Sequence, residues 1–262
     1  MELFLTLLLA GFGVGALVGL TGVGGGSLMT PLLISVLHVK AVVAIGTDLL
    51  FAAITKSSGA WVHARRGNVE WRLTLWLCAG SAPAALATLL WLSQQSAGNG
   101  NAAALTRPAL GVALIFTACA VALRPHLLAW LQRSATPSSR PAQLSLRNTV
   151  LIGAVLGAVV TLTSVGAGAL GVTALLILYP LLPFSRIVGS DIAHAVPLTF
   201  IAGTGHMAMG NVDFALLGGL LIGSLPGIYF GSKLSARVPE AILRALLCAL
   251  LIVAAYKMFS LK

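Results

Sequence analysis

Apolar residues run along this chain in long, nearly uninterrupted stretches that are separated by short polar segments. The stretches cover residues 3–37, 41–62, 73–92, 108–123, 148–182, 187–206, 214–231 and 241–256. Many are near the roughly 20 residues that a helix needs to cross a bilayer. Continuous apolarity favours helices over barrel strands, in which apolar and polar residues alternate. The pattern predicts an all-α, polytopic helical membrane protein with about eight membrane segments.

Composition agrees with a protein whose expected partner is the lipid bilayer. Of the 262 residues, 58% are hydrophobic and 8% are charged, whereas charged residues make up about 25% of a soluble domain. The formal net charge of +10 comes from Lys and Arg residues in short loops. Because no basic patch with interleaved aromatic residues is present, we expect this charge to set membrane topology and not to bind nucleic acid.

The chain also contains two internal repeats. Residues 23–26 (Val-Gly-Gly-Gly) return as 165–168 (Val-Gly-Ala-Gly), and 46–48 (Gly-Thr-Asp) return as 189–191 (Gly-Ser-Asp). We expect a first membrane repeat over residues 1–123, a basic cytoplasmic linker over 124–147 and a second membrane repeat over 148–262. Many membrane transporters build a central site from two such halves.

The stretches 3–37 and 148–182 are too long for one straight crossing, and Gly-rich sequence interrupts each near its middle. A helix of about 35 residues would measure roughly 52 Å, against a core of about 30 Å. If each stretch folds back to the same face, the repeats are inverted; if each crosses once, they are parallel. Inverted repeats place about 11 basic residues inside and about 4 outside, and parallel repeats about 9 and 6, so the positive-inside rule favours inversion.

The two interruptions are candidate anion sites. An interrupted helix leaves backbone N–H groups free, and the positive end of the following half-helix attracts negative charge. Two such ends would face one anion near the midplane; the alternative is close helix packing through small residues. The candidate substrate-binding residues at the interruptions are Gly24, Gly25, Gly26, Ser27, Gly166, Ala167 and Gly168.

Asp48 and Asp191 occupy equivalent positions within apolar segments, where an unpaired carboxylate is costly and indicates a function. Each is either a proton acceptor that couples transport to the proton gradient or a structural acceptor for the N–H groups of an interrupted helix. His194 lies three residues after Asp191 and joins these candidate proton-coupling residues. The hydroxyls of Thr47 and Ser190, one position before each Asp, are further candidate substrate contacts.

Lys56 lies deep in an apolar segment, and its repeat equivalent is Thr199. A buried ammonium can balance a bound anion or pair with Asp48, which lies about two turns away on the same helix face. No His and carboxylate cluster has metal-ligand spacing, and no Ser, His and Asp set has the order of a catalytic triad. We therefore expect no metal, no cofactor and no enzymatic activity.

With these features the sequence resembles the TauE/SafE family of sulfite and organosulfonate exporters. The matching features are the segment 11–19, the break at 22–28, the Pro-Leu-Leu at 31–33, the Gly-Thr-Asp at 46–48 and their echoes in the second half. The resemblance implies a multi-pass transporter of the cell inner membrane that moves sulfite, organosulfonates or related small sulfur-containing anions. The second break departs from the glycine run at Ala167, and Lys56 has no counterpart, so equal contributions from both halves are not assumed.

The expected function is secondary transport of such an anion, with the substrate held between the two breaks while one repeat rocks against the other. An anion channel and a non-transporting membrane scaffold or assembly protein are the alternatives. The sequence leaves open the exact substrate, the direction of transport, the coupling ion and whether the chain forms a homodimer.

The anion-site hypothesis predicts that Gly25→Val abolishes transport, because a side chain would enter the space where backbone N–H groups meet the anion. Insertion into the membrane should be unchanged, since the segment stays apolar. Flux measured at equal abundance of variant and unaltered protein tests this, and undiminished flux would contradict the proposed anion site.

Overall fold

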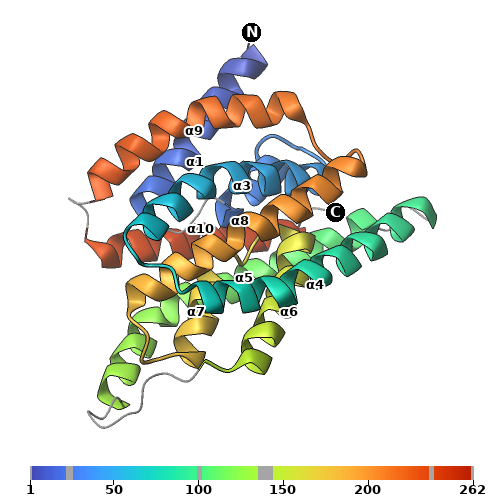
Figure 1. The fold of residues 1–262 in the computed structure, drawn as a ribbon. Coiled ribbons are helices and arrows are strands. Elements are labelled where there is room, and N and C mark those ends of the chain that lie inside the picture. Colours follow the sequence, from blue (N-terminus) through green and yellow to red (C-terminus); the bar gives the residue numbers. More distant parts are fainter. Residues whose placement is uncertain (1, 22–25, 99–101, 135–143, 236–238, 261–262) are drawn as a thin grey trace.

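The computed structural model describes residues 2–21, 26–98, 102–134, 144–235 and 239–260 (Figure 1). Within these residues the chain is helical and has no strand. The helices are α1 (Glu2–Thr21), α2 (Gly26–Ser35), α3 (Ala41–Arg65), α4 (Trp71–Gly98), α5 (Ala102–Ser134), α6 (Leu146–Thr163), α7 (Ala169–Leu178), α8 (Phe184–Ala208), α9 (Phe214–Ser235) and α10 (Glu240–Ser260).

Seven of the described helices, α3 to α6 and α8 to α10, are long and apolar enough to cross a membrane. Together with α1, which has 20 residues, they give eight long helices. These helices confirm the predicted all-α membrane class. Helices suit a membrane because they satisfy their backbone hydrogen-bonding groups internally, where no water is available. The segment expected as a linker, 124–147, begins within α5, since that helix continues to Ser134.

Each of the two longest apolar stretches is divided into a long and a short helix. The first break, residues 22–25, separates α1 from the 10-residue α2 and lies outside the described residues. The second break, residues 164–168, separates α6 from the 10-residue α7. Its backbone turns at Ser164 (φ +58°), Gly166 (φ +122°) and Gly168 (φ +123°). Glycine adopts positive φ without the steric penalty of a side chain, so these glycines permit the turn.

The two repeats are interleaved. Helices α1 to α5 correspond in order to α6 to α10, and the most extensive helix pairings each join one repeat to the other. These pairings are α1 with α9, α4 with α6, α3 with α8 and α5 with α10 (Figure 1). Neither repeat therefore buries its apolar surface mainly within itself, and the middle of the molecule belongs to both.

The equivalent helices α3 and α8 run antiparallel. A Cβ atom placed on Gly46, near the start of α3, would lie 2.1 Å from the carbonyl oxygen of Asn211, just beyond the end of α8. In the mirrored contact, a Cβ atom on Gly189, near the start of α8, would lie 2.0 Å from the carbonyl oxygen of Asn68, just beyond α3. Equivalent helices with opposite directions are the defining feature of inverted repeats, the arrangement that the charge count favours.

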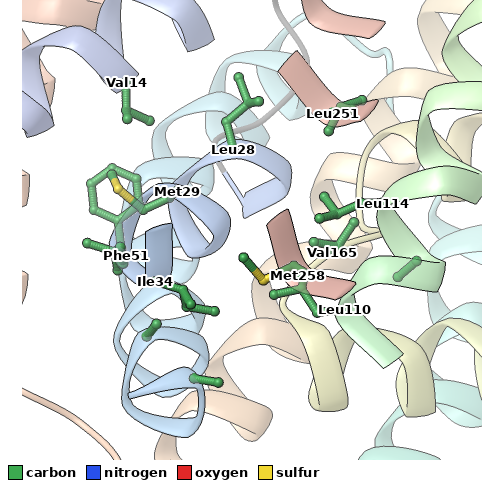
Figure 2. Close-up of a cluster of buried hydrophobic side chains, with 14 of the residues drawn as sticks. Val14, Leu28, Met29, Ile34, Phe51, Leu110, Leu114, Val165, Leu251 and Met258 are labelled. Carbon is green, nitrogen blue, oxygen red and sulfur yellow. The ribbon is translucent and has the colours of Figure 1, made fainter. Parts of the chain in front are cut away.

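Buried apolar side chains from both repeats pack around the short helix α2. Met29 and Leu33 of α2 are fully buried in this cluster. Figure 2 shows Val165, from the second break, among side chains of α5 and α10. The apolar residue of the second break is thus held by helices of both repeats, which fixes the position of the polar backbone that follows it.

Glycines bring α4 and α6 into close contact. A Cβ atom on Gly153 would lie 2.3 Å from the Leu77 carbonyl oxygen, and one on Gly157 would lie 2.4 Å from the Ser81 carbonyl oxygen. Such spacing of small residues lets helix backbones approach closely inside a membrane, where the hydrophobic effect does not drive helices together. The small residues Gly153 and Gly157 therefore allow α6 to pack closely against α4.

Gly157→Ala should destabilise the protein, because the added methyl group meets backbone atoms of Ser81 that cannot turn aside. Overpacking of this kind costs about 1–3 kcal/mol. The matched control is Gly218→Ala in α9, where an added Cβ atom meets nothing within 4 Å. Thermal unfolding in detergent measures both variants, and equal midpoints for the two would contradict the close approach of α4 and α6.

Candidate functional site

A cluster of buried polar side chains lies where α3 and α8 meet the second break. We call it the central polar cluster; its members are Thr30, Asp48, Lys56, Ser81, Ser164, Asp191 and His194, and each is at least nine-tenths buried. Polar and charged groups are costly inside a membrane protein unless they have partners or a function. The partners of each member therefore indicate what the cluster does.

Lys56 connects the first repeat to the second break. Its Nζ donates a 2.8 Å hydrogen bond to the carbonyl oxygen of Ala167. Ala167 lies between two glycines with positive φ, and this turn leaves its carbonyl without a helical partner. The Lys56 ammonium also interacts electrostatically with Asp191 and Asp48. Lys56 thus bridges the two repeats, and its role in balancing a bound anion stays a prediction.

Asp48 lies beside hydroxyl groups from both repeats. Its Oδ2 accepts a 2.5 Å hydrogen bond from the Thr30 hydroxyl of α2. Ser164, where α6 ends, lies next to the same carboxylate. Thr30 and Ser164 do not stand out in the apolar pattern of the sequence, because single hydroxyls in membrane helices often bond to their own backbone. Only the packing of α2 and the second break against α3 reveals their role.

Asp191 lies against the N-terminal end of α7. A Cβ atom on Gly171 would lie only 1.9 Å from Asp191 Oδ1, so α7 admits this carboxylate because Gly171 has no side chain. The Gly168 N–H, at the N-cap of α7, faces the same group. Neither oxygen of Asp191 makes a hydrogen bond of ordinary geometry with the described residues. The carboxylate therefore occupies a helix end that is suited to an anion.

His194 extends the cluster toward α4. Its Nε2 lies 2.8 Å from the Ser81 hydroxyl, and the ring interacts electrostatically with Lys56. The three candidate proton-coupling residues, Asp48, Asp191 and His194, are thus brought together with Lys56 around one break. The buried cluster thus contains two carboxylates, Asp48 and Asp191, and one ammonium, Lys56.

Thr47 and Ser190 point to the start of a helix in the other repeat. The Thr47 hydroxyl accepts a 3.1 Å hydrogen bond from the backbone N–H of Asp213, immediately before α9. The Ser190 hydroxyl accepts a 2.8 Å hydrogen bond from the backbone N–H of Glu70, immediately before α4. These equivalent bonds satisfy backbone donors at helix ends. A substrate contact for either hydroxyl stays a prediction.

The structure describes only part of the predicted anion site. Gly166, Ala167 and Gly168 lie at the second break beside Lys56 and Asp191. Gly24 and Gly25 lie outside the described residues. Gly26 and Ser27 are the first two residues of α2. A contribution from the first break to substrate binding stays a prediction.

Comparison with known proteins gives consistent results. A family model described as "Sulfite exporter TauE/SafE" matches residues 7–258. The "Probable membrane transporter protein YjnA" of Bacillus subtilis (strain 168) is 38% identical over 256 residues, which cover 97% of this chain and 98% of the relative. The "Probable membrane transporter protein YdhB" of the same organism is 26% identical over 247 residues, 91% and 93% of the two chains. No solved structure matches the chain.

Thr47→Val should lower stability, because the backbone N–H of Asp213 loses its acceptor while the shape of the side chain is kept. Loss of such a bond at a helix start costs about 0.5–2 kcal/mol. The control is Thr204→Val, whose hydroxyl bonds to carbonyl oxygens of its own helix. Thermal unfolding of both variants in detergent is the measurement. A Thr47→Val variant as stable as the control would contradict the role of this hydroxyl between the repeats.

Proposed function

Because the chain belongs to the sulfite exporter TauE/SafE family, we propose that it exports small sulfur-containing anions, such as sulfite or organosulfonates, across the cell inner membrane. The chain is a multi-pass membrane transporter, as its family, its relatives and its apolar helices indicate. The substrate class, the direction, the inner membrane and the coupling to protons are the parts that we propose.

The bond between Lys56 and the second break is the observation that most strongly supports an anion substrate. The Lys56 ammonium and the N-terminal end of α7 both contribute positive potential at the Ala167 turn. A buried ammonium of this kind attracts an anion strongly, because surrounding protein screens it far less than water does. An oxyanion fits this environment, since its oxygens accept bonds from the ammonium and from free backbone N–H groups.

We extend the proposed site to the first break by the equivalence of the repeats. Gly24, Gly25, Gly26 and Ser27 occupy the positions that match the second break in the sequence. In this proposal the substrate lies between the two breaks and contacts both repeats. Rocking of the interleaved repeats then exposes it alternately to the two sides of the membrane.

Proton coupling is proposed for Asp48, Asp191 and His194. All three are fully buried and belong to the central polar cluster. Two ionised carboxylates and one ammonium carry one net negative charge, and a bound anion adds a second, which a buried site tolerates poorly. Uptake of one proton removes that charge, so the cluster is suited to link anion binding to protonation.

Lys56→Gln should weaken the binding of sulfite and organosulfonates by about tenfold or more, because hydrogen bonds to charged groups contribute about 1.5–3 kcal/mol. Thermal stabilisation of the purified protein by a panel of sulfur anions, with chloride and phosphate for comparison, measures this. A ligand at a hundred times its dissociation constant stabilises by about 2.7 kcal/mol. The matched control is Lys257→Gln, at an exposed position of α10.

The proposal expects a selective shift with sulfite or a sulfonate that Lys56→Gln reduces and Lys257→Gln preserves. An equal shift in both variants would contradict the role of Lys56. The absence of a shift with every sulfur anion would contradict the proposed substrate class.

A further inference from the structure

We propose that Asp191 is a resident anion that occupies part of the substrate site until a substrate anion displaces it, and that the displaced carboxylate takes up one proton. This inference rests on the proposed function and specifies how protons are coupled to substrate binding. The proton comes from the surrounding water and binds to a carboxylate oxygen of Asp191. It returns to water when the substrate leaves.

The position of Asp191 is that of a bound anion. Its carboxylate lies at the N-terminal end of α7, against Gly171 and facing the Gly168 N–H. Lys56 interacts with it electrostatically from the other repeat. The same ammonium and the same helix end are the groups that the proposed function assigns to the substrate. Substrate and the ionised Asp191 therefore compete for one source of positive potential.

Asp191 is also the carboxylate that is free to leave. It is fully buried, yet neither of its oxygens has a hydrogen bond of ordinary geometry among the described residues. Asp48, its repeat equivalent, is held in place by the 2.5 Å bond from Thr30. The difference between the two acids assigns Asp191 to exchange with substrate, while the bond from Thr30 keeps Asp48 in place.

Charge balance explains why displacement requires a proton. Asp48, Asp191 and Lys56 together carry one negative charge when all are ionised, and a monovalent substrate adds a second. A carboxylate that has lost its positive surroundings inside protein is costly in its charged form and becomes neutral instead. One proton for each monovalent anion keeps the charge of the cluster unchanged.

The other titratable groups near Asp191 have different surroundings. His194, on the same helix, bonds to Ser81 of α4. Glu70, whose backbone N–H bonds to Ser190, has its carboxylate paired at 3.6 Å with Arg186. His63 of α3 lies beside Gly189, at the start of α8, and α7 contains no titratable side chain. Among these groups, Asp191 is the one that faces the N-terminal end of α7. A substrate anion that binds there takes the place of the Asp191 carboxylate beside Lys56 and the Gly168 N–H.

The consequence for transport is that anion and proton occupy the central polar cluster together. A monovalent anion would then cross the membrane with one proton in the same direction. Export of the substrate would carry protons outward with it, and the net direction would follow the combined gradients of the two.

The test is the pH dependence of methanesulfonate binding to the purified full-length protein, because this anion keeps its charge where sulfite itself exchanges a proton. Affinity should fall by about tenfold per pH unit above the pH at which Asp191 loses its proton, since one proton is taken up with the anion. Asp191→Asn should remove this dependence and keep binding at high pH as tight as that of the unaltered protein at low pH. Asp48→Asn is the matched control and should retain the dependence.

A second measurement needs no variant. Above the pH at which Asp191 loses its proton, binding of methanesulfonate in weakly buffered solution should take up about one proton for each anion bound. Binding without proton uptake, or a pH dependence that Asp191→Asn retains and Asp48→Asn loses, would overturn the inference while leaving the anion site intact. A protein that binds no sulfur anion at any pH would instead overturn the proposed function.

Discussion

The hydrogen bond from the Lys56 ammonium to the Ala167 carbonyl oxygen is the interaction on which the centre of the molecule depends. A charge at this depth is stable only where the protein supplies compensating groups. The compensation comes from both repeats, because Asp48 lies on the same helix as Lys56 and Asp191 lies on its equivalent. The turn at Gly166 and Gly168 adds a carbonyl that no helix uses. The second break therefore supplies one of the polar groups that compensate the charge of Lys56.

The inverted repeats bring these groups together from distant parts of the sequence. The antiparallel crossing of α3 and α8 places the start of each helix beside the loop that follows the other. Thr47 and Ser190 bond across this crossing in the same way at both ends. The symmetry ends at Lys56, because its equivalent, Thr199, bonds to carbonyl oxygens of its own helix. Lys56 therefore supplies a charge at the second break that its repeat equivalent, Thr199, does not carry.

The sequence predicts the broad architecture because hydropathy is a local property. The helices, the membrane segments and the second break follow from residues that stand out against an apolar background. The choice of Asp48, Lys56 and Asp191 as candidates follows from the same contrast. The partners of those residues do not follow, because they depend on the register between helices of different repeats. Gly171 leaves room for the Asp191 carboxylate because α7 packs against α8. Nothing in the local sequence distinguishes Gly171 from a glycine that only permits close helix packing.

We propose that the two repeats hold a small sulfur-containing anion at the central polar cluster and carry it across the membrane. Counterflow in proteoliposomes tests this directly: vesicles loaded with unlabelled sulfite are diluted into labelled sulfite. A transporter with a substrate site that alternates between the two sides predicts transient accumulation of label inside, without any imposed proton gradient. Intact, reconstituted protein that shows no counterflow of sulfite or of an organosulfonate would contradict the claim.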